Sequence, residues 1–424
     1  MKKTLAILCI GLGMASYAQE FEISAELRPR FEFRHGYKTL SDDSIDPAVF
    51  VSQRTRLNLG YKSEKINTYF SVQNLRVWGD VPTLAASDKN GTAIHEAWAE
   101  VLLSDWFFLK FGRQEINYDD HRMFGNVGWA QQARSHDALI ATFKPDENHR
   151  IDLGLALSAE SESLFEIDYN VNNYKSFQYI WYHTNLNNLG LSFLALNNGY
   201  AFADINNKQQ VDYNQTFGTH ATYGNNKLKA DASVYFQTGK LANSDLSAYN
   251  LALNVYYTIS QNINLGLGGE YLSGTDMYSS ADKIKSFNPW YGTNHKFNGW
   301  MDYFYVGNHI NSVGLVDFNV TLAYQKNKFF AKMVPHIFSS AATIVDEFGN
   351  EKSKDLGTEI DLILGYNFAK DIHFQVGYSQ IFATESMEIV KGGDSSETNN
   401  WAWVMITVKP SLFKTSFKKK EFKD

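Results

Sequence analysis

Apolar and polar side chains alternate with a period of two along most of the chain beyond residue 18. In 20–37, for example, Ile23, Leu27 and Phe31 alternate with mostly charged residues, and 246–260 repeats the pattern. Because side chains of a β-strand point alternately to its two faces, this pattern predicts strands with one apolar and one polar face. It predicts eighteen strands, at 20–37, 49–62, 66–79, 94–103, 106–118, 135–144, 149–160, 176–185, 189–199, 210–224, 228–239, 246–260, 263–274, 314–326, 329–340, 355–369, 372–384 and 399–410.

The connections between these strands alternate in length. Short connections rich in turn residues fall at 63–65, 104–105, 145–148, 187–188, 225–226, 261–262, 327–328 and 370–371. Long connections fall between them, at 39–48, 80–93, 119–134, 161–175, 200–209, 240–245, 275–313, 341–354 and 385–398. This alternation predicts an all-β fold, a single transmembrane antiparallel β-barrel of about 18 strands with short periplasmic turns and long extracellular loops. A secreted β-sandwich or solenoid is the alternative, although no internal repeat is visible.

The first eighteen residues have the composition of a secretory signal peptide. A basic start precedes the apolar run 4–15, and small residues flank Tyr17 just before the expected cleavage site. This order predicts a cleaved signal peptide over 1–18 and export of the remaining chain. The single cysteine, Cys9, lies inside this segment, so the exported part is expected to fold without disulfides.

The net charge of the exported chain indicates which classes of partner it can bind. Without the two lysines of the predicted signal peptide, 37 basic residues stand against 46 acidic ones, a net charge of −9. This acidic excess gives no support to nucleic-acid binding. The predicted barrel covers 19–413, and 414–424 forms a basic C-terminal tail. A barrel of this kind is expected in the bacterial outer membrane, with outer-membrane lipid and the barrel-assembly machinery as partners.

The order of several short motifs resembles the alginate-export family of outer-membrane porins. The motifs lie at 28–34, 54–57, 95–98, 112–122, 128–129, 134–138, 291–302 and 356–361, and the likeness extends over almost the whole exported chain. The resemblance implies an eighteen-stranded barrel and the passage of polyanionic saccharides. The interior of this chain departs from a uniformly basic one, because glutamates accompany its arginines.

Arginines are the candidate residues of a path for such a solute, because a guanidinium stays charged and can bind a carboxylate through two hydrogen bonds. The candidates are Arg28, Arg30, Arg34, Arg54, Arg56, Arg113, Arg122 and Arg134. Arg113 faces inward only if a bulge intervenes near Gly112. In the alternative interpretation, the arginines pair with carboxylates inside the barrel and brace its wall.

The longest connection, 275–313, is unusually long and rich in aromatic residues, so we expect it to fold into the lumen as a constriction. Its candidate constriction residues are Trp290, Tyr291, His295, Lys296, Trp300 and Asp302. In the connection 119–134, the run Asp119, Asp120 and His121 is a polar loop rather than a metal site, and the histidines lack the spacing of a zinc site. The sequence predicts no catalytic residues, no metal and no cofactor, and hence no enzyme.

Together with the resemblance, these features predict a channel that passes anionic saccharides through an arginine-lined lumen, as in alginate-like polyuronate export or the passage of a related anionic solute. The partner is then an anionic polysaccharide or oligosaccharide, with periplasmic export partners for an exporter. Two alternatives remain, a general or differently selective uptake porin and a non-conducting surface barrel used for adhesion.

Overall fold

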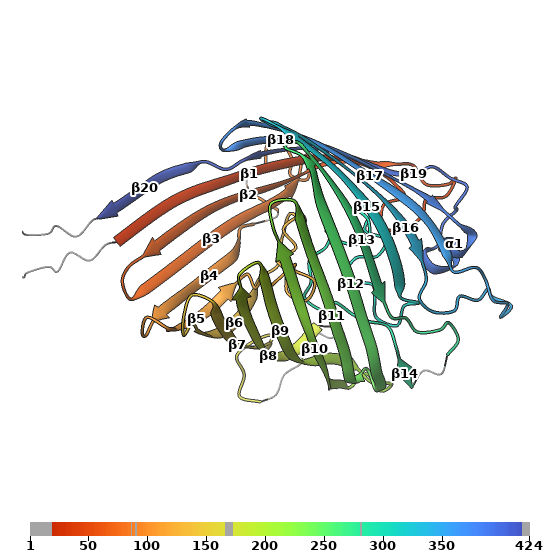
Figure 1. Cartoon of the computed structure of the whole chain (residues 1–424), viewed down its shortest axis with the longest axis horizontal. Coiled ribbons are helices and arrows are strands. Elements are labelled where there is room, and N and C mark those ends of the chain that lie inside the picture. The colour runs from red at the N-terminus through yellow and green to blue at the C-terminus, as the bar shows by residue number, and fades with distance from the viewer. Residues whose placement is uncertain (1–18, 86, 90, 166–172, 280–281, 418–424) are drawn as a thin grey trace, which may run out of the picture.

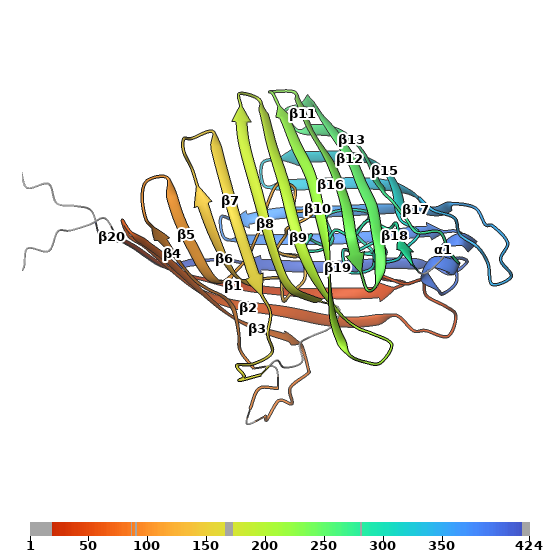
Figure 2. The ribbon, with the colours of Figure 1, turned by 90° about the horizontal axis from the view of Figure 1, so that it is seen from below.

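A computed structural model describes residues 19–85, 87–89, 91–165, 173–279 and 282–417. The predicted signal peptide, 1–18, and residues 418–424 lie outside these ranges. The described chain forms a closed antiparallel barrel whose strands make one continuous tilted wall (Figures 1 and 2). Among the described residues, no helix is long and apolar enough to cross a membrane.

The barrel has the eighteen wall strands that the alternation predicts. They are β1 (Gln19–His35), β2 (Ala48–Lys62), β3 (Ile66–Val77), β4 (Ala93–Leu102), β5 (Phe107–Gln114), β6 (His136–Phe143), β7 (His149–Leu157), β8 (Asn173–Leu186), β9 (Leu189–Ala203), β10 (Gln209–Gly224), β11 (Leu228–Leu241), β12 (Ser244–Ser260), β13 (Ile263–Leu272), β15 (Leu315–Lys326), β16 (Phe329–Ser339), β17 (Asp355–Ala369), β18 (Ile372–Ala383) and β19 (Asn399–Val408), which β20 (Ser411–Phe417) continues. The described residues also form β14 (Lys283–Ile284) and α1 (Glu385–Lys391), which the sequence pattern does not predict.

The first and last strands close the barrel. Strand β1 pairs with β2 on one side, and with β19 and then β20 on the other. Closure satisfies the backbone hydrogen-bonding groups of both edges, which lipid could not do. The predicted boundary between barrel and tail, at 413/414, falls inside β20, because Ser411–Phe417 pairs with the start of β1.

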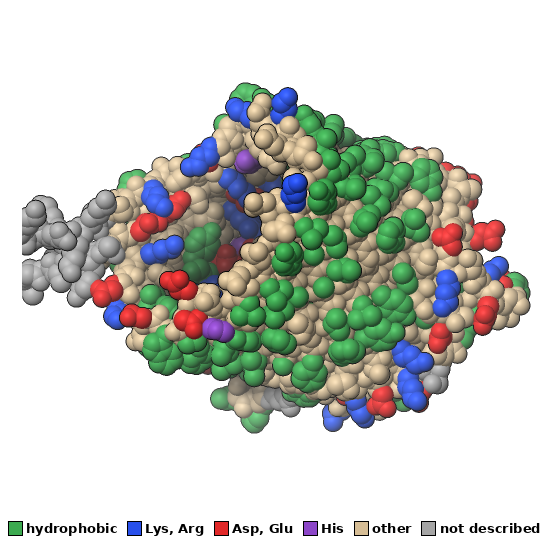
Figure 3. All heavy atoms as spheres, in the orientation of Figure 1, with side chains coloured by type: hydrophobic (Ala, Val, Ile, Leu, Met, Phe, Trp, Pro, Cys, Tyr) green, Lys and Arg blue, Asp and Glu red, His purple; other side chains and the backbone are tan. Residues whose placement is uncertain are grey.

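The outer face of the wall is apolar and the inner face is mixed. Leu253 and Phe318 are 54% and 51% exposed, whereas Trp401 and Trp403 are buried inside. Figure 3 shows hydrophobic side chains spread over the outer strands, beside a hollow that has Lys, Arg and His side chains on its inner wall. An apolar outer band with a polar interior is the arrangement that a barrel needs in a bilayer.

Two long connections leave the wall and fold inward. The first inward loop, 115–135, follows β5, which ends at Gln114 and not at 118 as the alternation predicts. The second inward loop, 273–314, includes the predicted constriction segment and buries Phe287, Met301 and Tyr303 completely.

The two inward loops are joined to each other. The backbone N–H of Gly125 donates to the carbonyl of Tyr291 at 2.8 Å, and that of Thr293 donates to the carbonyl of His121 at 2.9 Å. The sequence pattern indicates only the second loop as a constriction. The structure makes the constriction from both.

Candidate functional site

Arginines of β1 and β2 hold the first inward loop by its backbone carbonyls. Arg28 donates to the carbonyl oxygens of Gly128 at 2.8 Å and Trp129 at 3.1 Å. The inner face of the wall therefore presents guanidinium donors to a chain segment that has left the sheet and carries unpaired acceptors. We call Arg28, Arg30, Arg54 and Arg56, with the carbonyls of 128–132, the cation clamp; the further contacts are Arg30 to Trp129, Arg54 to Ala130 and Gln131, and Arg56 to Gln132.

Most arginines of β1 and β2 are also paired with a glutamate of the same wall. Arg54 lies 2.6 Å from Glu26, and both side chains are buried. Glu32 lies 2.9 Å from Arg30 and 2.8 Å from Arg34. These contacts agree with the interpretation of the arginines as braces, and contact between them and a solute stays a prediction.

Carboxylates of β17 hold the second inward loop by its backbone N–H groups. The N–H of Met301 donates to Glu359 Oε1 at 2.8 Å, and the N–H of Trp300 donates to Asp361 Oδ2 at 3.1 Å. Gly299 has a φ of +82°, and a Cβ there would lie 2.6 Å from Glu359 Oε1, so glycine allows this close approach. We call Glu359 and Asp361, with these two N–H groups, the anion clamp.

A histidine and an aspartate extend the anion clamp along the wall. His336 Nδ1 lies 2.9 Å from Asp317 Oδ1, and its Nε2 lies 3.7 Å from Asp361 Oδ2. Asn298 of the second inward loop donates to Asp317 at 3.2 Å. Because each buried carboxylate here accepts hydrogen bonds, the wall can keep several acidic groups close together.

The loops also contact each other through charged and aromatic side chains. Arg122 of the first inward loop forms an ion pair with Glu270 of β13 and donates to Asn298 at 2.7 Å. The rings of Trp129 and His295 stack with their centroids 4.1 Å apart. Arg122 therefore links the first loop both to the second loop and to the wall.

Asp302 of the second inward loop is buried between His295 and Tyr37. Burial alone would raise the pKa of its carboxyl group. The nearby ring of His295, 3.7 Å away, and the hydrogen bond that the Tyr37 hydroxyl donates outweigh burial and lower this pKa below its usual value.

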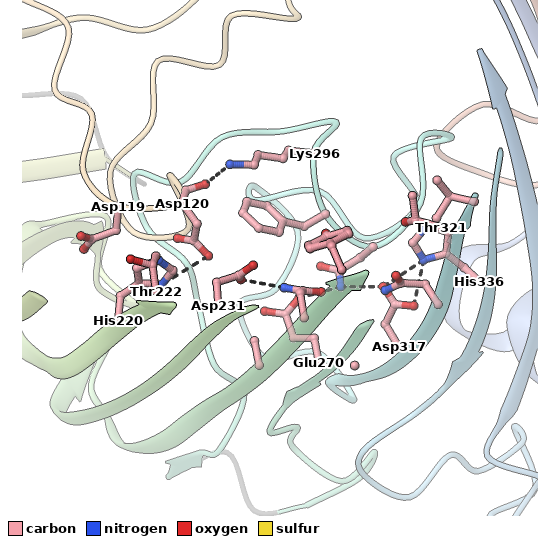
Figure 4. A pocket seen from close by; sticks show the side chains of 18 of the residues that line it. Asp119, Asp120, His220, Thr222, Asp231, Glu270, Lys296, Asp317, Thr321 and His336 are labelled. Atoms are coloured by element: carbon pink, nitrogen blue, oxygen red, sulfur yellow. Dashed lines mark hydrogen bonds and ion pairs between the residues drawn. The ribbon is translucent and has the colours of Figure 1, made fainter. Parts of the chain in front are cut away.

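Two cavities lie on the short-turn side of the loops. One of about 410 Å³ is lined by the Arg28, Arg54 and Arg56 side chains of the cation clamp and by glutamates of neighbouring strands. The other, of about 370 Å³, is lined by β8 to β13, by β15 and β16, and by both loops (Figure 4). Lys296 lines it and donates to the carbonyl of Asp120 at 2.5 Å, while burial lowers the pKa of the Lys296 ammonium group.

A third cavity, of about 640 Å³, lies on the long-loop side and contains Arg134. The Arg134 guanidinium donates to the carbonyl of Gly292 at 2.7 Å. No Asp or Glu lies within ion-pair distance of it among the residues that the structure describes. Burial lowers the pKa of Arg134 to about 10, so the group stays charged at neutral pH. The rings of Tyr174, Trp290 and Tyr291 line the same cavity.

The sequence of the chain matches that of a known protein family. Residues 20–402 match the model of the alginate-export family. The chain belongs to this family. No curated protein shows a significant match to it.

Solved structures similar to this alginate-export family member include outer-membrane channels of the Occ type. Acinetobacter baumannii OccAB1 superposes with a TM-score of 0.65 at 11% identity, over 93% of this chain and 97% of that chain. Pseudomonas aeruginosa OccK1 (OpdK) has a TM-score of 0.63 at 10% identity, over 93% and 99%. At such low identity the likeness shows the fold. Family and fold together identify an outer-membrane channel protein, not an enzyme.

Arg113 of this family member does not face the lumen. Gly112 has a φ of +110°, yet Arg113 pairs with Asp137 at 2.7 Å, opposite it on β6. The neighbouring Gln114 and His136 are buried inward, so the pair occupies the outward side of both strands. The prediction that Arg113 faces inward required a bulge near Gly112 that turns its side chain into the lumen. The conformation of Gly112 does not turn the Arg113 side chain in this way.

The remaining predicted residues are spread over both loops. Asp119 accepts a hydrogen bond from Trp181 Nε1 at 3.0 Å, and Asp120 accepts one from the backbone N–H of Arg122. These contacts are those of a polar loop. Tyr291 donates to Asn198 of β9, and so fixes the second inward loop to the wall.

Sequence reasoning missed the anion clamp. Glu359 and Asp361 belong to a stretch that the resemblance marks, and the alternation puts both on one face of β17. Two carboxylates on one inward face were therefore a visible signal. Their partners are backbone N–H groups 58 and 61 residues away, which no local pattern reveals.

Proposed function

We propose that this protein is an outer-membrane channel for anionic saccharides, and that Arg134 is the cation that the solute meets on the long-loop side. The observation that carries the proposal is that Arg134, in a cavity of about 640 Å³, has no carboxylate partner among the residues that the structure describes. A partly buried guanidinium without a counter-ion favours the entry of an anion, and it can bind a carboxylate through two hydrogen bonds.

The surroundings of Arg134 suit a sugar acid better than an inorganic anion. Tyr174, Trp290 and Tyr291 offer ring faces, against which the apolar face of a sugar can pack. Asn198 and Asn288 line the same space with amide groups that can hydrogen-bond to hydroxyls. Aromatic faces, amides and one cation together are the groups that a uronic acid residue requires.

The arginines of the cation clamp have a different part in this proposal. They are hydrogen-bonded to loop carbonyls and to glutamates, so they shape the constriction and contribute a positive field to the passing solute. The family supports anionic polymers as cargo. The P. aeruginosa channel OpdK was solved with vanillate, itself an anion, which supports passage of carboxylates through a barrel of this shape.

Planar-bilayer recordings of the purified protein test the proposal. We expect a conducting channel with weak anion selectivity that oligouronates block and neutral oligosaccharides of equal length do not. Block should occur at lower concentration from the long-loop side, because Arg134 lies on that side of the constriction. A channel without selectivity or block would favour the general uptake porin, and the absence of conductance would favour the adhesion barrel.

A pair of variants isolates the contribution of Arg134. Arg134→Gln should weaken oligouronate block about tenfold, the effect of losing one charge-assisted hydrogen-bond pair. Arg113→Gln is the matched control, because it removes the same charge from an arginine that lies on the outward side of β5 and is already paired with Asp137. Equal effects of the two substitutions would show that only the overall charge matters and would contradict the role of Arg134.

A further inference from the structure

Three side chains able to bind a metal meet where the first inward loop leaves the wall. His95 and Glu96 lie on β4, and Glu115 is the first residue after β5. One ligand atom of each lies within 4.8 Å of the other two, and His95 Nε2 lies 2.8 Å from Glu115 Oε1. We propose that these three residues bind a divalent transition-metal ion of the zinc type.

A β-bulge brings the two neighbours in sequence to the same side. Ser71 of β3 pairs with Glu96, but Val72 pairs with Ile94, so His95 is an extra residue on β4. Adjacent side chains of a regular strand point to opposite faces, and a bulge re-aims one of them. His95 is 3% exposed. Both its ring and the Glu96 carboxylate are therefore available to one inward site.

The charge balance at this point of the wall differs from that around the cation clamp and Arg122. Glu26, Glu32 and Glu270 each lie within ion-pair distance of an arginine. Among the residues in the described ranges, neither Glu96 nor Glu115 has a Lys or Arg within 4.0 Å. Two carboxylates that lie close together repel each other, and a bound cation removes that repulsion.

The donor set indicates the class of ion. One imidazole nitrogen and two carboxylate oxygens suit Zn²⁺ and its neighbours in the transition series, whereas Mg²⁺ and Ca²⁺ prefer oxygen ligands alone. Glu96 and Glu115 also line the cavity of about 410 Å³. That cavity gives an ion a route of entry and leaves room for water as the fourth ligand.

A metal ion bound at this site would fix the start of the first inward loop. A metal held by β4 and Glu115 fixes the residue at which the first inward loop begins. The cation clamp fixes the same loop at 128–132. The loop would then be held at both ends, by a metal at its start and by arginines near its end.

Metal binding can be measured on tag-free, detergent-solubilised protein that has been stripped with a chelator. Equilibrium dialysis against Zn²⁺ should give about one tightly bound ion per chain, and Co²⁺ should give the visible absorption of a four-coordinate site. His95→Ala and Glu96→Gln should each weaken Zn²⁺ binding at least about tenfold, because each removes one of three protein ligands.

Two comparisons make the result decisive. His183→Ala is the matched control, because His183 also faces the lumen but bonds to Ser192 and Asn185 instead of carboxylates, and it should leave binding unchanged. Glu96→Gln keeps an acceptor for the indole N–H of Trp98, so it should fold even if His95→Ala does not. The proposal fails if wild-type protein binds no stoichiometric Zn²⁺, or if Glu96→Gln binds as tightly as wild type.

Discussion

The cation clamp on β1 and β2 and the anion clamp on β17 each hold one inward loop, but they bind opposite ends of the peptide group. Arg28 and its neighbours donate to carbonyl oxygens of the first loop. Glu359 and Asp361 accept from backbone N–H groups of the second loop. An inward loop has both kinds of unpaired backbone group, and either can be satisfied by a charge on the wall.

The difference between the clamps lies in how their own charges are balanced. Arg54 and Glu26 form a buried pair at 2.6 Å, so a carboxylate of the same wall directly balances the charge of Arg54 in the cation clamp. Glu359 and Asp361 are two acids side by side, and the imidazole ring of His336 lies 3.7 Å from Asp361. Removing a charge should therefore disturb the first clamp severely, whereas in the second clamp it also relieves repulsion.

Arg54→Ala should have the largest effect. It leaves Glu26 buried, and the cations that remain near it among the described residues are Lys409 at 3.4 Å and Arg28 at 3.8 Å. Breaking a buried pair costs about 3–5 kcal/mol. We expect a loss near the lower end of that range in urea unfolding from vesicles, with a rise in conductance as 130–131 loses its donor.

The control for this prediction is Arg34→Ala. Arg34 has a side chain that is 32% exposed, and Glu32 keeps Arg30 as a partner after the substitution. The cost should be about 1 kcal/mol or less, as for an exposed pair. If both variants lost the same stability, the buried pairing of Arg54 would not distinguish the cation clamp.

The second prediction tests whether charges belong only to the inner face. Leu253 lies mid-way along β12 and faces outward, whereas Asn254 lines the cavity of Figure 4. Arg at Leu253 should cost about 2–4 kcal/mol, because it places a charge in hydrocarbon. Arg at Asn254 should be tolerated. Folding yield into vesicles measures both, and equal losses would contradict the register of β12.

These predictions use features that the sequence revealed to different degrees. The period-two pattern located all eighteen wall strands and placed Arg28, Arg30, Arg54 and Arg56 on the inner face. A local pattern reports which side chains alternate. It cannot report that Arg28 meets the carbonyl of Gly128, which lies 100 residues away.

The end of β5 shows the same limit. Ile116 and Tyr118 continue the alternation beyond Gln114, so the pattern extends the strand to 118. Both side chains are buried, but against the interior core and not against lipid. Apolar residues that pack inside the lumen look identical in sequence to those that face a membrane, because both environments exclude water.

The third prediction concerns the anion clamp. Asp361→Asn keeps an oxygen that can accept from the N–H of Trp300 but loses the charge that strengthens the bond. Relief of repulsion with Glu359 offsets part of the loss, so we expect about 1–2 kcal/mol. Hydrogen exchange at the Trp300 and Met301 amides should accelerate. Unchanged exchange at both amides would mean that Asp361 does not hold the second loop.

The fourth prediction has the smallest expected effect and concerns Lys391, a cation without a carboxylate partner among the described residues. Lys391 ends α1 on the long-loop side, with its ammonium group 4.8 Å from the ring centroid of Phe304, a residue of the second inward loop. No carboxylate lies within ion-pair distance of it in the described part of the chain. Burial lowers the pKa of Lys391 to about 8.

The lowered pKa has a definite sign in stability. The folded chain disfavours the charged amine, so the penalty is fully present below pH 8 and declines as pH rises toward the unfolded value of about 10.4. The rate of amine labelling at Lys391, mapped by mass spectrometry, should show a midpoint near pH 8. A peptide of residues 384–393 should show one near pH 10. A midpoint near pH 10 in the intact barrel would contradict this prediction. The buried ammonium group of Lys391 would then keep its charge without a charged partner of the kind that the residues of both clamps have.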